Sequence, residues 1–181
     1  MDLLKDISEN KFVLVLLDSM QYEQKLGEVV KKTGKDSAKI CYVCLSRPYH
    51  DAIDYLKEME LDIHKFFFID VLTSHYKKPD GVENCIFLED PKIHAIQAAI
   101  TKAIAQQKCT VVIFDTISSL LMYEQSDEII KFTHDLTIEK KHQDVNKVFI
   151  VLKENNALSP FQDSFVKDVE MFTDKTISID G

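Results

Sequence analysis

The chain has 181 residues, of which 45% are apolar and 29% are charged, and its formal net charge is −8. This length and composition are typical of a soluble globular protein, so we expect residues 1–181 to form a single domain. The negative charge repels phosphate backbones and argues against nonspecific nucleic-acid binding. The lysines between positions 25 and 39 alternate with acidic residues, and we interpret them as the solvated face of a helix.

No apolar run in the sequence approaches the roughly 20 residues that a membrane-spanning helix needs. The opening residues, MDLLKDISENK, lack the pattern of a signal peptide. We therefore expect a cytoplasmic protein that has no membrane partner.

Apolar, strand-like runs alternate with helical patterns along the whole chain. In chain order, we expect a strand at 12–17, a helix at 20–32, a strand at 39–45, a helix at 49–59, strands at 66–72 and 85–88, a helix capped by Asp90 that begins at Pro91, a strand that ends at Asp115, a helix at 126–141, a strand at 147–153, a helix at 159–172 and a strand at 175–180. Several of the strands show no polar alternation, so both of their faces should be covered by helices. The sequence thus predicts an α/β fold, a three-layer αβα sandwich around a mostly parallel, doubly wound sheet.

Cys41 and Cys44 form a CxxC pair inside the second expected strand, KICYVCL. Such a pair can bind zinc or carry redox chemistry. Residues three apart on a strand point to opposite faces, however, so these two sulfur atoms should diverge. We interpret both as small buried hydrophobic side chains. The Phe66–Phe68 triplet is likewise interpreted as core packing.

Asp115 follows an apolar, β-branched run, CTVVIF, and Thr116 and Ser118 come directly after it. Ligands of open α/β sheets bind at the carboxyl ends of the strands, where this aspartate should lie. A carboxylate with neighbouring hydroxyl groups can organise a hydrated magnesium ion. Asp115 is therefore the candidate metal ligand of the chain.

The phosphate loop that should accompany such an aspartate is missing. The first strand is followed by LLDSMQYEQKLG, which has no glycine before the helix and no Gly-Lys-Ser/Thr triplet. Asp18 is positioned to cap the helix instead, with Gln21 three residues later as in a capping box. The chain also has one arginine, Arg47, although arginine is the usual residue for bidentate phosphate recognition.

The order of these segments resembles that of the RecA-like ATPases, and most closely their KaiC-like branch, which is common in archaea and bacteria. FVLVLL resembles the strand before the phosphate loop, CTVVIFDTISSL resembles the Walker B strand, and NKVFIVLKE and DVEMFTDKTISID resemble the closing strands, with Asp174 before the last one. The resemblance covers residues 10–180 and implies a RecA-like sheet.

The chain departs from this family at two of its three catalytic parts. The Walker A loop is absent, and Ser46 and Arg47 stand where the family usually places a catalytic glutamate after the second strand. By this resemblance the chain is a degenerate member, a pseudoenzyme that has kept the fold and lost ATP hydrolysis. Such a member would have no cofactor and no catalytic residue.

Three functional hypotheses follow. The first is a regulatory or scaffold protein, for example in signalling, whose partner is itself or an active KaiC-like relative. The second is a nucleotide-binding protein or slow NTPase that binds ATP and Mg²⁺ through Asp115, Thr116, Ser118 and Lys153. The third is a phospho-acceptor module similar to receiver domains, with Asp18 and Asp70 as its acids. We favour the first, because the phosphate loop is missing.

Several single residues have a structural interpretation that we prefer. Asp115 is expected to accept backbone N–H groups from a neighbouring loop, Arg47 to be a surface residue and Lys153 to be solvated. Glu139 and His142 are one helical turn apart, as in an ordinary surface pair. The histidines show no metal-ligand spacing.

Overall fold

The computed structural model describes residues 7, 9–33, 39–73, 79–90, 92–155 and 157–179. The strands are β1 (Phe12–Asp18), β2 (Ile40–Cys44), β3 (Phe66–Asp70), β4 (Cys85–Phe87), β5 (Val111–Asp115), β6 (Asn146–Lys153) and β7 (Lys175–Ile179). The helices are α2 (Tyr22–Thr33), α3 (Tyr49–Glu58), α4 (Ile93–Gln107), α5 (Ser126–Ile138) and α6 (Pro160–Glu170). Short 3-10 turns lie at η1 (Ser19–Gln21), η2 (Ile63–Lys65), η4 (Ile117–Met122) and η5 (Lys140–His142).

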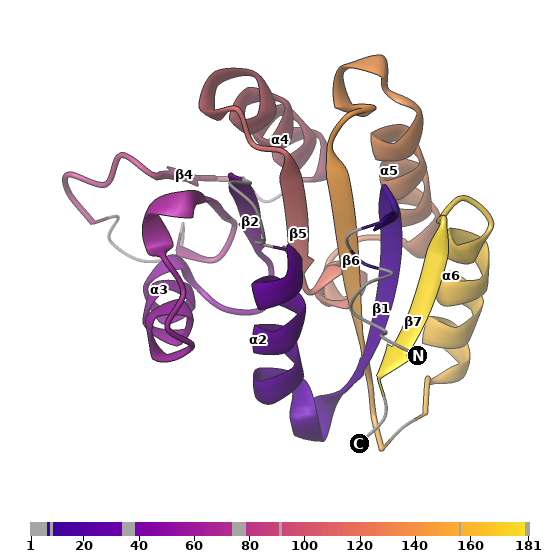
Figure 1. Ribbon diagram of the computed structural model, residues 1–181. Helices are drawn as coiled ribbons and strands as arrows, with labels where there is room; N and C mark the ends of the chain where they lie inside the picture. Colours follow the sequence, from indigo (N-terminus) through magenta and orange to yellow (C-terminus); the bar gives the residue numbers. More distant parts are fainter. Residues whose placement is uncertain are drawn as a thin grey trace.

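The seven strands form one sheet in the order β4-β3-β2-β5-β6-β1-β7, and every neighbouring pair is parallel (Figure 1). Parallel neighbours need crossover connections, and helices supply them everywhere except between β3 and β4, where no α-helix lies among the described residues. The predicted αβα sandwich with a parallel, doubly wound sheet is confirmed.

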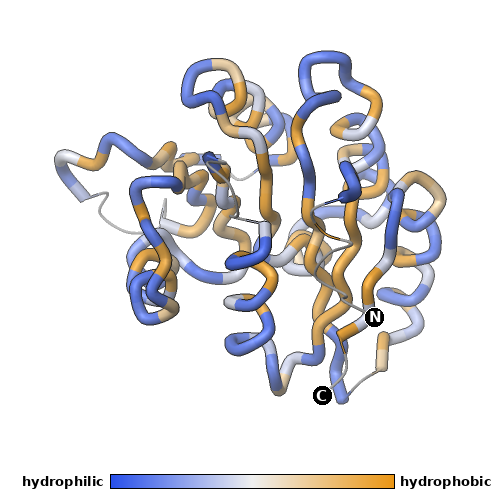
Figure 2. The backbone as a smooth tube through the Cα atoms, in the orientation of Figure 1, coloured by the Kyte–Doolittle hydropathy of each residue, from blue (hydrophilic) through white to orange (hydrophobic). Residues whose placement is uncertain are grey.

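Each face of the sheet has its own hydrophobic core. Side chains of α2 and α3 pack on one face, and those of α4, α5 and α6 pack on the other. Along β1, for example, Val13, Val15 and Leu17 join the first core, and Leu14 and Leu16 join the second. Figure 2 shows the consequence, since the central strands are hydrophobic along their length and the helices alternate between apolar and polar residues.

The same alternation confirms the interpretation of the CxxC pair. Cys41 lies in the core beneath α4 and α5, whereas Cys44 lies in the core beneath α2 and α3. Both are buried and free. Phe66, Phe67 and Phe68 are also buried, as predicted for core residues.

The start of α4 differs from the prediction. The helix begins at Ile93 and its N-cap is Lys92, which makes no capping hydrogen bond through its side chain. Asp90 is therefore too early in the chain to cap it, and Pro91 lies outside the described residues. The isolated Asp-Pro signal located the helix but not its first turn.

Gly27 permits an unusually close approach between α2 and α3. A Cβ atom at this position would lie 2.7 Å from Sδ of Met59, which is inside van der Waals contact. Nearby, the hydroxyl of Tyr55 donates a hydrogen bond of 2.5 Å to the backbone carbonyl of Glu23. These contacts hold α2 against α3. They therefore help to position the first turn of α2 relative to β2, the strand that precedes α3.

The helices also define where the chain changes face. The connections after β1 and β2 lead to helices on one face, and those after their neighbours β6 and β5 lead to helices on the other. The carboxyl edge between these strands is the place where open α/β sheets bind ligands. None of the described helices combines the length and the apolar character needed to cross a bilayer.

Candidate functional site

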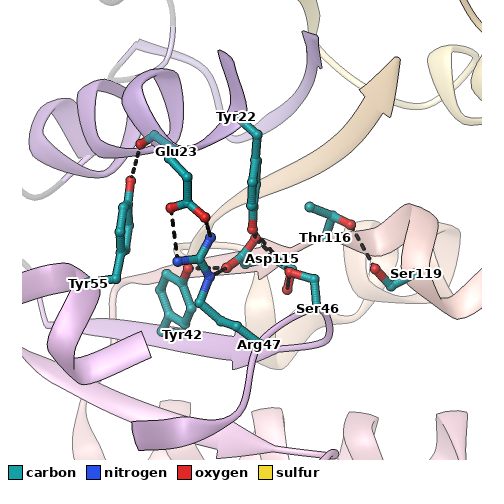
Figure 3. A network of polar contacts seen from close by, with 9 residues as sticks. All are labelled: Tyr22, Glu23, Tyr42, Ser46, Arg47, Tyr55, Asp115, Thr116 and Ser119. Carbon is teal, nitrogen blue, oxygen red and sulfur yellow. Dashed lines mark hydrogen bonds and ion pairs between the residues drawn. The ribbon is translucent and has the colours of Figure 1, made fainter. Parts of the chain in front are cut away.

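Asp115 ends β5 at this carboxyl edge, and its side chain is fully buried. Its carboxylate accepts hydrogen bonds from the hydroxyl groups of Tyr22 and Tyr42, and the Ser46 hydroxyl lies 3.2 Å from Oδ1 (Figure 3). Burying a carboxylate is costly unless hydrogen bonds and an opposite charge compensate it. These three hydroxyl groups supply the hydrogen bonds.

Arg47 supplies the opposite charge. Its Nε lies 3.1 Å from Oδ2 of Asp115, an ion pair that lies off the N–H direction of a hydrogen bond. The two terminal nitrogens each donate a 3.1 Å hydrogen bond to Glu23, in the bidentate geometry that a guanidinium favours. The guanidinium also stands over the rings of Tyr22 and Tyr55, 5.0 and 4.3 Å from their centroids.

The expectation that Arg47 is a surface residue is therefore wrong. Its side chain is only 12% exposed, because two aromatic rings and two carboxylates enclose it. The expected role of Asp115 is also corrected. Its backbone carbonyl accepts the N–H groups of Leu45 and Ser46, at 2.9 Å each, but its carboxylate contacts side chains rather than loop amides.

Burial and charge act in opposite directions on the acid–base groups of this cluster. Burial raises the pKa of the Asp115 carboxyl, against the opposing effects of Arg47 and the hydroxyl donors. Burial and the neighbouring Asp115 charge raise the pKa of both Tyr22 and Tyr42. Burial alone would lower the pKa of Arg47, but the charge of Asp115 raises it. The two tyrosines thus remain hydrogen-bond donors and Arg47 remains a cation.

In the turn between β1 and α2, a side chain of the protein binds a backbone N–H group. Asp18 is the N-cap of η1, and its Oδ1 accepts the Met20 N–H at 2.9 Å. The predicted capping role of Asp18 is confirmed in part: it caps the 3-10 turn rather than α2, and it accepts the N–H of Met20 rather than that of Gln21, which a capping box would use. Tyr22, the first residue of α2, then extends over Asp115. An acid and an aromatic ring therefore occupy the turn that would need bare amides to bind phosphate.

The other candidate residues for a nucleotide site make hydrogen bonds of their own within the protein. Thr116 is fully buried, and its hydroxyl lies 3.1 Å from Ser118 and 2.9 Å from Ser119. The Ser118 hydroxyl accepts the Leu152 N–H at 3.3 Å. The Thr116 and Ser118 hydroxyl groups are thus engaged within the protein, where they tie η4 to β6.

Lys153 is only 4% exposed, so the expectation of a solvated lysine is wrong. It ends β6, where it pairs in register with Asp18 of β1, and its Nζ donates a 2.9 Å hydrogen bond to the Ser178 hydroxyl of β7. This lysine belongs to the β1, β6 and β7 side of the edge. His142, expected in a surface pair, is also fully buried, 3.5 Å from Glu139, and desolvation lowers its pKa.

The acids of the receiver-like hypothesis are not brought together. Asp18 ends β1 and Asp70 ends β3, and three strands lie between them in the sheet. Among the described residues, no three His, Cys, Asp or Glu side chains gather where they could hold a metal ion. Asp115 contributes a single carboxylate, and that carboxylate already has four partners.

Sequence analysis missed four members of this cluster: Tyr22, Tyr42, Glu23 and Tyr55. They come from α2, β2 and α3, which the fold brings together across long stretches of sequence. One signal was available. The chain has a single arginine, and it stands immediately after a strand, at the edge where Asp115 was expected.

No protein-family model matches the chain, and no curated protein matches it. Among solved structures, it is similar to a KaiC-like protein from the hyperthermophilic archaeon Pyrococcus horikoshii, with a TM-score of 0.64 and 11% sequence identity. The match covers 95% of this chain and 74% of the other. At this identity the likeness concerns the fold, and the chain has a RecA/KaiC-like α/β fold.

Proposed function

We propose that this chain is a non-catalytic regulatory or interaction protein, a cytoplasmic pseudo-ATPase on a RecA/KaiC-like fold. The observation that carries the proposal is that the Asp115 carboxylate is already bound by other side chains. Its carboxylate lies at the carboxyl edge of the sheet, yet Tyr22, Tyr42, Ser46 and Arg47 already occupy it. A metal ion at Asp115 would have to displace donors that the protein supplies itself.

The segment before α2 supports the same proposal. Phosphate binding at a helix N-terminus needs free backbone N–H groups and favours positive charge. Here Asp18 accepts the Met20 N–H in the 3-10 turn before α2, and Glu23 adds a second carboxylate in the first turn of α2. The Glu23 carboxylate is paired with Arg47, so both groups are already engaged within the protein.

The position after β2 supports it as well. A water-activating base must present a free carboxylate near the attacking water. The residues here are Ser46 and Arg47, and the guanidinium is held between Asp115 and Glu23. The proposed activity therefore lies in surface contacts with a protein partner, either a second copy or an active KaiC-like relative. No cofactor is needed for it.

Isothermal titration with Mg²⁺ and ATP tests the loss of nucleotide binding. We expect no saturable heat at millimolar ATP. Saturable binding at micromolar ATP would contradict the proposal and support the alternative, a nucleotide site around Asp115, Thr116, Ser118 and Lys153. In that case Lys153→Met and Ser118→Ala should weaken binding, whereas Lys167→Met, on the exposed face of α6, should not.

A further inference from the structure

The turn between α5 and β6 lies at the amino edge of the sheet, opposite the Asp115 cluster, and appears at the top of Figure 1. We call residues 140–144 the η5 turn. Four of its five residues are exposed, and His142 is the exception, with a fully buried side chain. The imidazole of His142 is therefore the side chain through which this turn is attached to the rest of the protein.

Two hydrogen bonds define which nitrogen of the imidazole carries a hydrogen. The Thr101 hydroxyl on α4 has a single proton, which it donates to the carbonyl of Gln97 at 3.0 Å. The oxygen of the same hydroxyl lies 3.1 Å from Nε2 of His142 and must therefore act as the acceptor there. The neutral ring thus carries its hydrogen on Nε2, and Nδ1 has a bare lone pair.

Nδ1 of His142 is the atom that acid would protonate. It is buried, and no described residue donates a hydrogen bond to it. Oε2 of Glu139 lies 3.5 Å away, off the geometry of a hydrogen bond. A buried polar atom without a hydrogen-bond partner is rare in folded proteins and calls for an explanation.

A buried cation already lies beside this ring. Lys147 is fully buried, and its Nζ donates hydrogen bonds of 2.7 Å to the carbonyl of His142 and 2.9 Å to that of Val145. Within the described ranges Lys147 belongs to no ion pair. Burial and the charge of Lys11 lower its pKa to about 8, so it is still mostly charged at neutral pH. A proton on His142 would add a second positive charge next to this ammonium group.

The surroundings of His142 favour the neutral ring. Burial has the largest effect and lowers the pKa of His142. Glu139 opposes this effect, but its side chain is 31% exposed, so water weakens its attraction. The charges of Lys147 and Lys141 lower the pKa further, and α4 faces the ring with the uncharged Thr101. The closed turn therefore accommodates a neutral imidazole and disfavours a charged one.

We propose that the η5 turn is a pH-sensitive switch, attached to α4 while His142 is neutral and released when Nδ1 is protonated. The switch lies at the other edge of the sheet and is independent of the proposed interaction function. As the pH falls below the ordinary histidine value of 6.5, the imidazole of an open turn binds a proton before that of a closed turn. Opening therefore becomes up to about tenfold more favourable per pH unit, until the closed ring titrates as well.

Nitrogen NMR of the histidine rings in the whole chain tests the protonation step. Long-range ¹H–¹⁵N spectra should show the Nε2–H tautomer for His142. Its titration midpoint should lie below that of histidine in a short unstructured peptide, measured in the same buffer. A midpoint at or above the peptide value would overturn the proposal.

Amide hydrogen exchange tests the release of the turn. The amides of His142 and Val145 bond to carbonyls within the segment, those of Glu139 and His142. After correction for the intrinsic pH dependence of exchange, their protection should fall by up to about tenfold per pH unit below 6.5, whereas protection in β1 should stay constant. Protection of these two amides that does not change with pH would contradict the proposal.

Three variants show whether His142 causes the effect. His142→Gln keeps an N–H donor for Thr101 but cannot be protonated, so the pH dependence of protection should disappear. Lys147→Met should weaken the pH dependence, because it removes the positive charge beside the ring. His50→Gln, at an exposed position of α3, is the matched control and should behave as the natural chain.

A pH dependence that survives His142→Gln would also overturn the proposal. The NMR titration uses the natural chain, so it decides the protonation step even if a variant fails to fold. None of these outcomes bears on the loss of nucleotide binding, which the ATP titration tests separately.

Discussion

Asp70 and Asp115 lie on either side of β2, each at the end of its strand, and both are fully buried. Asp70 accepts the backbone N–H groups of Tyr49, Leu72 and Thr73 at 2.7 to 2.9 Å, together with the Thr73 hydroxyl. Asp115 is instead surrounded by side chains, namely two tyrosines, a serine and an arginine. The Asp70 carboxylate thus binds mainly backbone N–H groups, whereas the Asp115 carboxylate binds side chains.

The two aspartates differ in how far along the sequence their hydrogen-bond partners lie. Two of the backbone partners of Asp70 lie within three residues of it, so it shapes the turn that follows β3. The partners of Asp115 come from α2, β2 and the segment after β2. Asp115 therefore joins separate elements of the fold, and each of its partners can be removed without altering the backbone.

Asp115→Ala should give the largest effect. It leaves Arg47, only 12% exposed, without its buried counter-charge, and removing one partner of a buried pair costs about 3–5 kcal/mol. Urea denaturation measures the loss in the free energy of unfolding. The double variant Asp115→Ala with Arg47→Met removes both charges and should recover part of the loss. If Asp115→Ala proves as stable as the natural chain, the proposed joining role is wrong.

Asp70→Asn should have a smaller effect of about 1–3 kcal/mol, because an amide can still accept some of the backbone N–H groups. The NH₂ group of the new asparagine would face N–H donors that the carboxylate oxygen accepted. Those donors lose their acceptor, and this loss lowers the free energy of unfolding. Asp62→Asn is a suitable control, since Asp62 accepts the N–H group of His64 at an exposed position. If Asp70→Asn lowers the free energy of unfolding more than Asp115→Ala does, Asp70 rather than Asp115 is the more important of the two carboxylates for stability.

Alkaline pH should affect the Asp115 cluster through its titratable donors. Burial raises the pKa of Tyr22 above the ordinary 10.0, so the unfolded chain loses this proton first and the free energy of unfolding falls as the pH rises above 10.0. Tyr22→Phe should flatten this fall by at most about 1.4 kcal/mol per pH unit. The measurement is the unfolding free energy of both proteins between pH 9 and 11. Identical slopes would show that Tyr22 does not titrate as its contacts imply.

Ser46→Ala should give the smallest effect, about 0.5–1 kcal/mol, because Oδ1 of Asp115 keeps its bond from Tyr22. Thermal unfolding followed by circular dichroism is sensitive enough to detect it. A loss that matches Asp115→Ala would mean that the serine, rather than the arginine, compensates the buried carboxylate.

The fold was predictable because its signals are local. Continuous apolar runs such as FVLVLL and VVIF predict strands covered on both faces, and the intervening periodic segments predict the helices. The position of Asp115 at the sheet edge followed from its place at the end of an apolar, strand-like run. The predicted start of α4 was two residues too early, because capping depends on geometry that a sequence motif does not determine.

The partners of the buried charges were not predictable in the same way. Lysine and arginine are mostly exposed, so Lys153 and Arg47 were expected in solvent. Whether such a residue is buried depends on which elements converge on it. Tyr22 and Tyr42 are 20 positions apart, and Asp115 is 73 positions beyond Tyr42, so only the folded sheet brings them together.

The enclosure of Arg47 has a practical consequence. It is the only arginine in the chain, and two rings and two carboxylates enclose its guanidinium. A dicarbonyl reagent selective for guanidinium groups should therefore modify the native protein slowly and at one position. The rate of that modification would report how often the contacts of Arg47 with α2 and β5 break and expose its guanidinium. No label or introduced residue is needed.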